Sequence, residues 1–152
     1  MMTFSKTLLL LIALGTSLFA KEYKAIFDCS SKNYAYVMSR MFLIERTMDM
    51  MQEDGSKVDF VLTIHGACAP IVSENFDEVI EDDNDLKLIE QAQTQLKKLA
   101  TKKDVKVIVC AMSLNANTIE KEDVLDFVKI SKNSFIETIG YQNDGYALMT
   151  FK

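Results

Sequence analysis

The chain has 152 residues, of which 49% are hydrophobic and 26% charged, the balance of an ordinary globular protein with one domain. Its formal net charge of −5 and the lack of a basic stripe exclude a nucleic-acid binder, whose surface must attract phosphates. A single histidine excludes any metal site built from several histidines.

The first twenty residues have the layout of a secretory signal peptide. Lys6 gives the segment a positive start, residues 8–14 form an unbroken apolar run, and Ala20 is a suitable residue before a cleavage site. A membrane-spanning helix needs about 20 apolar residues, and this run is shorter, which argues against an anchor. We therefore expect cleavage after Ala20, a single mature domain over 21–152, and a periplasmic location without membrane attachment.

The first half of the mature chain alternates between strand and helix patterns. Residues 23–29 are short, apolar and followed by two serines, which favours a strand. Residues 33–51 carry apolar side chains at spacings of three and four, as one face of a helix does. Residues 58–64 are almost entirely apolar, as expected of a strand buried on both faces. The connection 65–85 contains Pro70, which suits the first turn of a short helix.

The second half continues the alternation. Asp85 is a suitable N-cap for a helix that runs to about Thr101, and lysines near its end favour the helix dipole. A capping-box pattern begins at Ser134 and predicts another helix start. The remaining predicted elements are, in chain order, a strand over 105–111, a short helix over 120–126, a strand over 127–130 and, after the helix from Ser134, a strand over 146–151.

This alternation predicts the fold class. Successive strand–helix–strand units imply right-handed crossovers and parallel strands. We therefore expect an α/β protein: a three-layer sandwich of flavodoxin-like character, with a mostly parallel five-stranded sheet and helices on both faces.

The three cysteines fall at strand ends. Cys29 ends the first strand, Cys68 follows the second, and Cys110 lies near the end of the third. Carboxyl ends of parallel strands meet at one edge of the sheet, where open α/β sheets bind ligands, so we expect all three thiols there. If the first strand is central, Cys29 and Cys110 sit on neighbouring strands. Cys29 is expected to be a buried packing residue, whereas Cys68, in a His-Gly-Ala-Cys-Ala-Pro loop, is expected to be exposed.

Thiol chemistry requires a thiolate, whose formation is favoured near a helix N-terminus or a cation. Cys110 precedes a loop and a helix start, and His65 lies three residues before Cys68, where it could act as a base. In an exported protein one pair of cysteines can form a disulfide, and the odd number leaves at least one thiol outside that pair.

Methionine, cysteine and histidine in an exported chain also suggest a Cu(I) site, because copper(I) prefers soft ligands. The methionines of residues 33–51 lie on an apolar helix face, where core packing explains them. Such a site would use Cys68 and Cys110 with Met112 or His65. No Cys-x-x-Cys spacing supports it.

Several short motifs occur in a characteristic order. The second predicted strand ends in His65-Gly66, and the third carries Val109-Cys110-Ala-Met-Ser-Leu114 before a turn. The last helix is followed by Gly145-Tyr146-Ala147. Their order and spacing over nearly the whole mature chain resemble the DsrE/DsrF-like sulfur-relay family.

This resemblance implies a three-layer α/β fold, assembly into homo-trimers or homo-hexamers, and sulfur carried as a persulfide on Cys110. Cys68 is not part of the general family pattern, and we interpret it either as a resolving partner, which could leave a Cys68–Cys110 disulfide, or as a feature of an exported branch of the family. The predicted function is an exported sulfur carrier or sulfurtransferase-like protein that exchanges sulfane sulfur with a partner protein or a small compound. It needs no cofactor and no metal. The alternative is a non-catalytic copper-binding or oligomer-assembly module.

Overall fold

A computed structural model describes residues 21–151, so the predicted signal peptide over 1–20 lies outside the described residues. The elements in chain order are β1 (Glu22–Cys29), α1 (Tyr34–Glu53), β2 (Lys57–Ile64), the 3₁₀ segments η1 (Gly66–Val72) and η2 (Phe76–Glu78), α2 (Asp83–Lys102), β3 (Lys106–Cys110), α3 (Ala111–Ala116), the 3₁₀ turn η3 (Lys121–Asp123), β4 (Lys129–Ser131), α4 (Ser134–Asn143) and β5 (Ala147–Phe151).

The five strands form one sheet in the order β4-β3-β2-β1-β5. All four strand pairs are parallel, which confirms the predicted α/β class. The centre of the sheet is β2, because each crossover up to β4 adds its strand on the same side and only β5 returns to pair with β1. Cys29 and Cys110 are therefore separated by β2: the first strand is not central, and the neighbouring placement expected in that case does not occur. This order also differs from the flavodoxin order 2-1-3-4-5.

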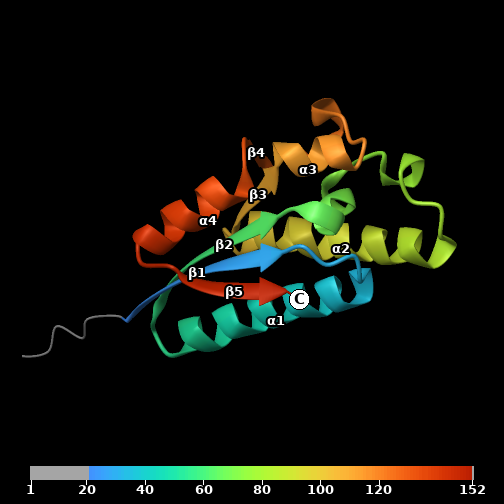
Figure 1. Cartoon of the computed structure of the whole chain (residues 1–152). Coiled ribbons are helices and arrows are strands. Elements are labelled where there is room, and N and C mark those ends of the chain that lie inside the picture. The colour runs from blue at the N-terminus through green and yellow to red at the C-terminus, as the bar shows by residue number, and fades with distance from the viewer. Residues whose placement is uncertain (1–20, 152) are drawn as a thin grey trace, which may run out of the picture.

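Helices cover both faces of the sheet (Figure 1). The helices α1 and α2 pack on one face over the main hydrophobic core, whereas α4 lies on the other face. The right-handed crossover rule explains this division, since the connection from β4 to β5 runs across the sheet opposite to the earlier ones. The face under α4 has a small core, made of Ile26, Val61, Ile108 and Tyr146.

Helix starts follow the side chains that cap them. The side chain of Asn33 accepts a hydrogen bond from the third residue of α1, at 3.0 Å, in agreement with the predicted start. The N-cap of α2 is Asp82 and not Asp85, and the N-cap of α4 is Asn133 and not Ser134. In both cases an Asp or Asn in extended backbone precedes the predicted cap and satisfies the first free N–H groups.

The carboxyl edge of the sheet contains most of the differences from the predicted elements. The helix α3 follows β3 without a loop, and the predicted helix over 120–126 is only the 3₁₀ turn η3. Pro70 lies inside η1 and does not open a helix. Among residues 21–151, no helix combines the length and the apolar character that crossing a membrane would require.

Candidate active site at the carboxyl edge of the sheet

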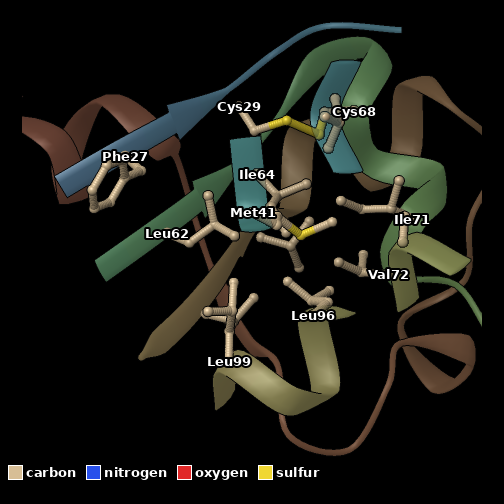
Figure 2. Packing of buried hydrophobic residues seen from close by; sticks show 14 of the residues in the cluster. Phe27, Cys29, Met41, Leu62, Ile64, Cys68, Ile71, Val72, Leu96 and Leu99 are labelled. Carbon is tan, nitrogen blue, oxygen red and sulfur yellow. A yellow bond between two sulfur atoms is a disulfide. The ribbon is translucent and has the colours of Figure 1, made fainter. Parts of the chain in front are cut away.

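All three cysteines lie at the carboxyl edge, as predicted, but only two of them are joined. Cys29 at the end of β1 and Cys68 in η1 form a disulfide, with a Cα–Cα distance of 6.0 Å (Figure 2). Cys68 is fully buried, so its predicted exposure is wrong: η1 folds inward and buries the apolar residues that follow. The Cys68–Cys110 disulfide that a resolving role of Cys68 would leave is not present, and Cys110 is the free cysteine of residues 21–151.

Cys110 combines burial with hydrogen bonds that favour a thiolate. It is the last residue of β3, directly precedes α3, and is 4% exposed. Burial raises the pKa of the Cys110 thiol, but hydrogen bonds from the backbone of Ser134, Ser113 and Met112 and from the Ser113 hydroxyl outweigh it. The pKa of Cys110 therefore lies below its usual value, and a larger fraction of the side chain is nucleophilic thiolate.

Ser113 connects Cys110 to the segment that follows β2. Its hydroxyl oxygen accepts a hydrogen bond from the Gly66 N–H at 2.8 Å, so its own proton is left for the Cys110 sulfur. The amide of Asn117 donates to the Gly66 carbonyl at 2.9 Å and to the Ser113 carbonyl at 2.7 Å. Gly66 has a φ of +54°, a left-handed backbone that favours glycine. The Gly66 backbone of the His65-Gly66 motif thus contacts α3, the helix that Cys110 precedes, and the residue that ends it.

His65 is paired with a carboxylate. Its Nε2 lies 3.0 Å from Asp28 Oδ1 and 3.1 Å from Asp28 Oδ2, and the Thr63 hydroxyl donates to the same carboxylate at 2.9 Å. The hydrogen bond with Asp28 raises the pKa of His65 against the opposing effect of burial, and the charge of Cys110 raises it further. Burial raises the pKa of Asp28, but hydrogen bonds from His65 and Thr63 and the His65 charge outweigh it and leave that pKa lowered. The predicted role of His65 as a base for Cys68 is wrong, because Cys68 has no thiol.

The Asp28–His65 pair predicts a pH-dependent contribution to stability. The contribution from the raised pKa of His65 is complete below the ordinary histidine value and is lost as the pH rises through the folded value. The contribution from the lowered pKa of Asp28 is present above the ordinary aspartate value and is lost in acid. We expect Asp28→Asn to lower the free energy of unfolding by about 1–2 kcal/mol between those limits, and by less above the folded pKa of His65.

Urea unfolding of both proteins at about pH 5.5 and about pH 8.5 measures this difference. Asp59→Asn is the matched control, because Asp59 pairs with Tyr146 and Lys106 and not with the histidine. Its cost should not shrink between the two pH values. An equal cost of Asp28→Asn at both pH values would contradict the assignment.

The predicted copper ligands do not come together. The sulfur of Cys68 is bonded to Cys29, and the Met112 side chain is 62% exposed. Within residues 21–151 there is no group of three or more His, Cys, Asp or Glu side chains that could hold a metal ion. The donor set that remains, Cys110 with His65, is too small for a soft-metal site.

Three residues of the site were not predicted. Asp28 could have been noticed, because it is an acid near the end of the apolar first strand. Its side chain faces the opposite side of the sheet from that of Cys29, since side chains alternate along a strand. Ser134 was predicted only as a helix start. Nothing in the sequence marks Ser113, whose partner Gly66 is 47 residues away.

Comparison with known proteins places this chain in a family. The model of the DsrE/DsrF-like family matches residues 24–151. An uncharacterized protein of Aquifex aeolicus is 34% identical over 146 residues, which cover 96% of this chain but 64% of that protein, so the chain spans less than two thirds of its relative.

Two solved structures are also similar. A protein of unknown function from Methanobacterium thermoautotrophicum has a TM-score of 0.64 at 14% identity, with 85% of this chain and 99% of that one covered, which shows the fold alone. The ychN protein of E. coli has a TM-score of 0.49 at 15% identity, over 87% and 99% of the two chains. The family model covers most of the sequence, including Cys110, and the chain therefore belongs to the DsrE/DsrF-like family.

Proposed function

We propose that this protein carries sulfane sulfur as a persulfide on Cys110 and passes it to an acceptor thiol. The observation that carries the proposal is a buried free cysteine between the end of β3 and the start of α3, at the carboxyl edge of a DsrE/DsrF-like fold, where surrounding backbone and hydroxyl groups lower its pKa. Such an environment favours the thiolate, the form of cysteine that attacks sulfur.

The chemistry is an exchange at sulfur. The Cys110 thiolate attacks a sulfur atom of a polysulfide, a new S–S bond forms, one S–S bond of the polysulfide breaks, and its electron pair leaves with the shortened chain. That leaving group takes a proton from water. An acceptor thiolate then attacks the outer sulfur and restores the Cys110 thiolate. No net oxidation occurs, so no redox cofactor is needed.

The arrangement of the cysteines favours an external acceptor. A resolving attack by Cys68 would require a thiol, but its sulfur is held in the disulfide with Cys29. Cys110 is 4% exposed, which restricts access to its sulfur to a small compound or to a side chain that a docked partner inserts. We therefore propose a sulfane-sulfur compound or a partner's persulfide as donor, and a thiol outside this protomer as acceptor.

Intact mass spectrometry tests this proposal directly. Protein treated with polysulfide is expected to gain about 32 Da for each sulfur atom, and a reductant should reverse the gain. Protein treated with sulfide alone is the control, because sulfide contains no sulfane sulfur. An unchanged mass after polysulfide treatment would contradict the proposal.

Export is a second part of the proposal. The signal-like segment 1–20 supports it, and so does a disulfide, since disulfides persist in oxidising compartments. The protein recovered from a periplasmic fraction is expected to begin at Lys21. A protein that keeps Met1 and stays in the cytosolic fraction would contradict this part.

Exposed apolar surface supports a homo-oligomer, which we propose to be a trimer or hexamer. A groove of about 300 Å³ lies between α1 and the edge strand β5. Large apolar side chains that are exposed together are typical of surfaces that another protein covers. The large exposed apolar residues of the described chain are Phe42, Leu43 and Met50 on α1, Met112 on α3, Phe135, Ile136 and Ile139 on α4, and Leu148 and Met149 on β5.

Light scattering behind size-exclusion chromatography tests this assembly. The measured mass is expected to be three or six times that of one chain. A monomer mass at micromolar concentration would contradict the proposal.

A further inference from the structure

The Cys29–Cys68 disulfide borders the turn formed by His65 and Gly66, which contacts the helix after Cys110. The backbone N–H of His65 donates to the Cys29 carbonyl at 2.9 Å, and the Cys68 N–H donates to the His65 carbonyl at 3.1 Å. The backbones of Cys29 and Cys68 therefore both bond to His65. The S–S bond also joins the two chain segments to which these cysteines belong. The bond ties the end of β1 to η1 and restrains the turn between β2 and η1.

That restrained turn contacts the atoms around Cys110. Gly66, the next residue, donates its N–H to the Ser113 hydroxyl at 2.8 Å and accepts from the Asn117 amide at 2.9 Å. With its oxygen occupied as an acceptor, the Ser113 hydroxyl has its proton free for the Cys110 sulfur. A continuous path of bonds thus joins the disulfide to Ser113, which lies in the first turn of α3, the helix that Cys110 precedes.

We infer that the Cys29–Cys68 disulfide positions the Cys110 thiolate, by holding Gly66 where it orients the Ser113 hydroxyl. The inference rests on the proposed function of Cys110 for its biological meaning, whereas the alkylation rate that tests it can be measured without that function. Neither Cys29 nor Cys68 touches the transferred sulfur. They act as positioning residues, and loss of their bond weakens the nucleophile without removing it.

Two opposing changes, in the population of the thiolate and in its nucleophilicity, determine how much the rate of Cys110 alkylation should fall. Loss of one hydrogen bond to the thiolate lowers its population about tenfold at a pH below its titration midpoint. The thiolate that remains is intrinsically about threefold more nucleophilic, because nucleophilicity rises with basicity. Alkylation of Cys110 should therefore slow about threefold, and the midpoint of its pH profile should move upward.

The rate of Cys110 alkylation by iodoacetamide, followed by intact mass across pH, measures this effect. Oxidised wild type is compared with Cys29→Ala/Cys68→Ala, and the three cysteines of the chain leave Cys110 as the free thiol in both proteins. Leu99→Ala is the matched control, because it weakens the core while the disulfide stays intact. Ser113→Ala should by itself reproduce the slowing, and removal of the disulfide in that background should add nothing.

Two results would overturn the inference: an unchanged rate and midpoint in the double variant, or an equal change in Leu99→Ala. If the double variant does not fold, Asn117→Ala removes one hold on Gly66 with the disulfide intact. It should slow alkylation in the same direction, and an unchanged profile would overturn the inference. Because alkylation involves no sulfane sulfur, a failure of polysulfide to load Cys110 would remove the proposed function alone.

Discussion

Replacing Cys110 by serine is expected to abolish the polysulfide-dependent mass gain of about 32 Da while the protein stays folded. A serine hydroxyl is not ionised near neutral pH and does not form a persulfide. Serine has nearly the shape of cysteine, and its oxygen can accept the hydrogen bonds that the Ser113 hydroxyl and the backbone around it donate. The loss should therefore be chemical and not structural.

Parallel intact-mass measurements on the two proteins check this expectation, with circular dichroism and thermal unfolding as tests of folding. Ser113→Ala is the matched control, since it alters the same site but keeps the thiol. It should still gain about 32 Da, at a lower rate. A mass gain that persists in folded Cys110→Ser would show that Cys110 is not the carrier.

Removal of the disulfide is expected to lower the free energy of unfolding by about 4 kcal/mol. Cys29 and Cys68 are 39 residues apart, so the bond closes a long loop of the unfolded chain and reduces its entropy. Both side chains are also fully buried, and alanine at these positions loses the packing of the sulfur atoms. For a domain of this size, such a loss is a large part of the whole stability.

Urea unfolding of wild type and of Cys29→Ala/Cys68→Ala measures this cost. Cys110→Ser is a useful companion, because it keeps the disulfide and should unfold near the wild-type midpoint. Wild type with a strong reductant should approach the double variant. A difference below about 1 kcal/mol would show that the bond contributes little to stability.

The fold was largely predictable because it depends on local patterns. The apolar spacing in residues 33–51 and the capping side chain of Asn33 define α1, and the apolar run of β2 indicates a strand buried on both faces. The position of β2 at the centre of the sheet was not predictable, because pairing order depends on contacts between distant segments. For the same reason the sequence left the cysteine pairing open, and the structure joins Cys29 with Cys68.

The site was predictable only in part. The end of β3 and the family resemblance both pointed to Cys110. The helix α3 was missed because six residues are too few to show a helical period. Ser113 lies on that helix, and its importance depends on Gly66, which reaches it through the fold and not through the chain.

The disulfide also has a consequence for the order in which the protein matures. Its loop contains the whole of α1 and β2, so the folded β1-α1-β2 unit brings the two sulfurs together. In a chain that emerges from its N-terminus, Cys29 and Cys68 become available before Cys110 does. The native pair therefore has the first opportunity to oxidise, and once it has formed, Cys110, the proposed sulfur carrier, has no free cysteine among Cys29 and Cys68 with which to form a wrong disulfide.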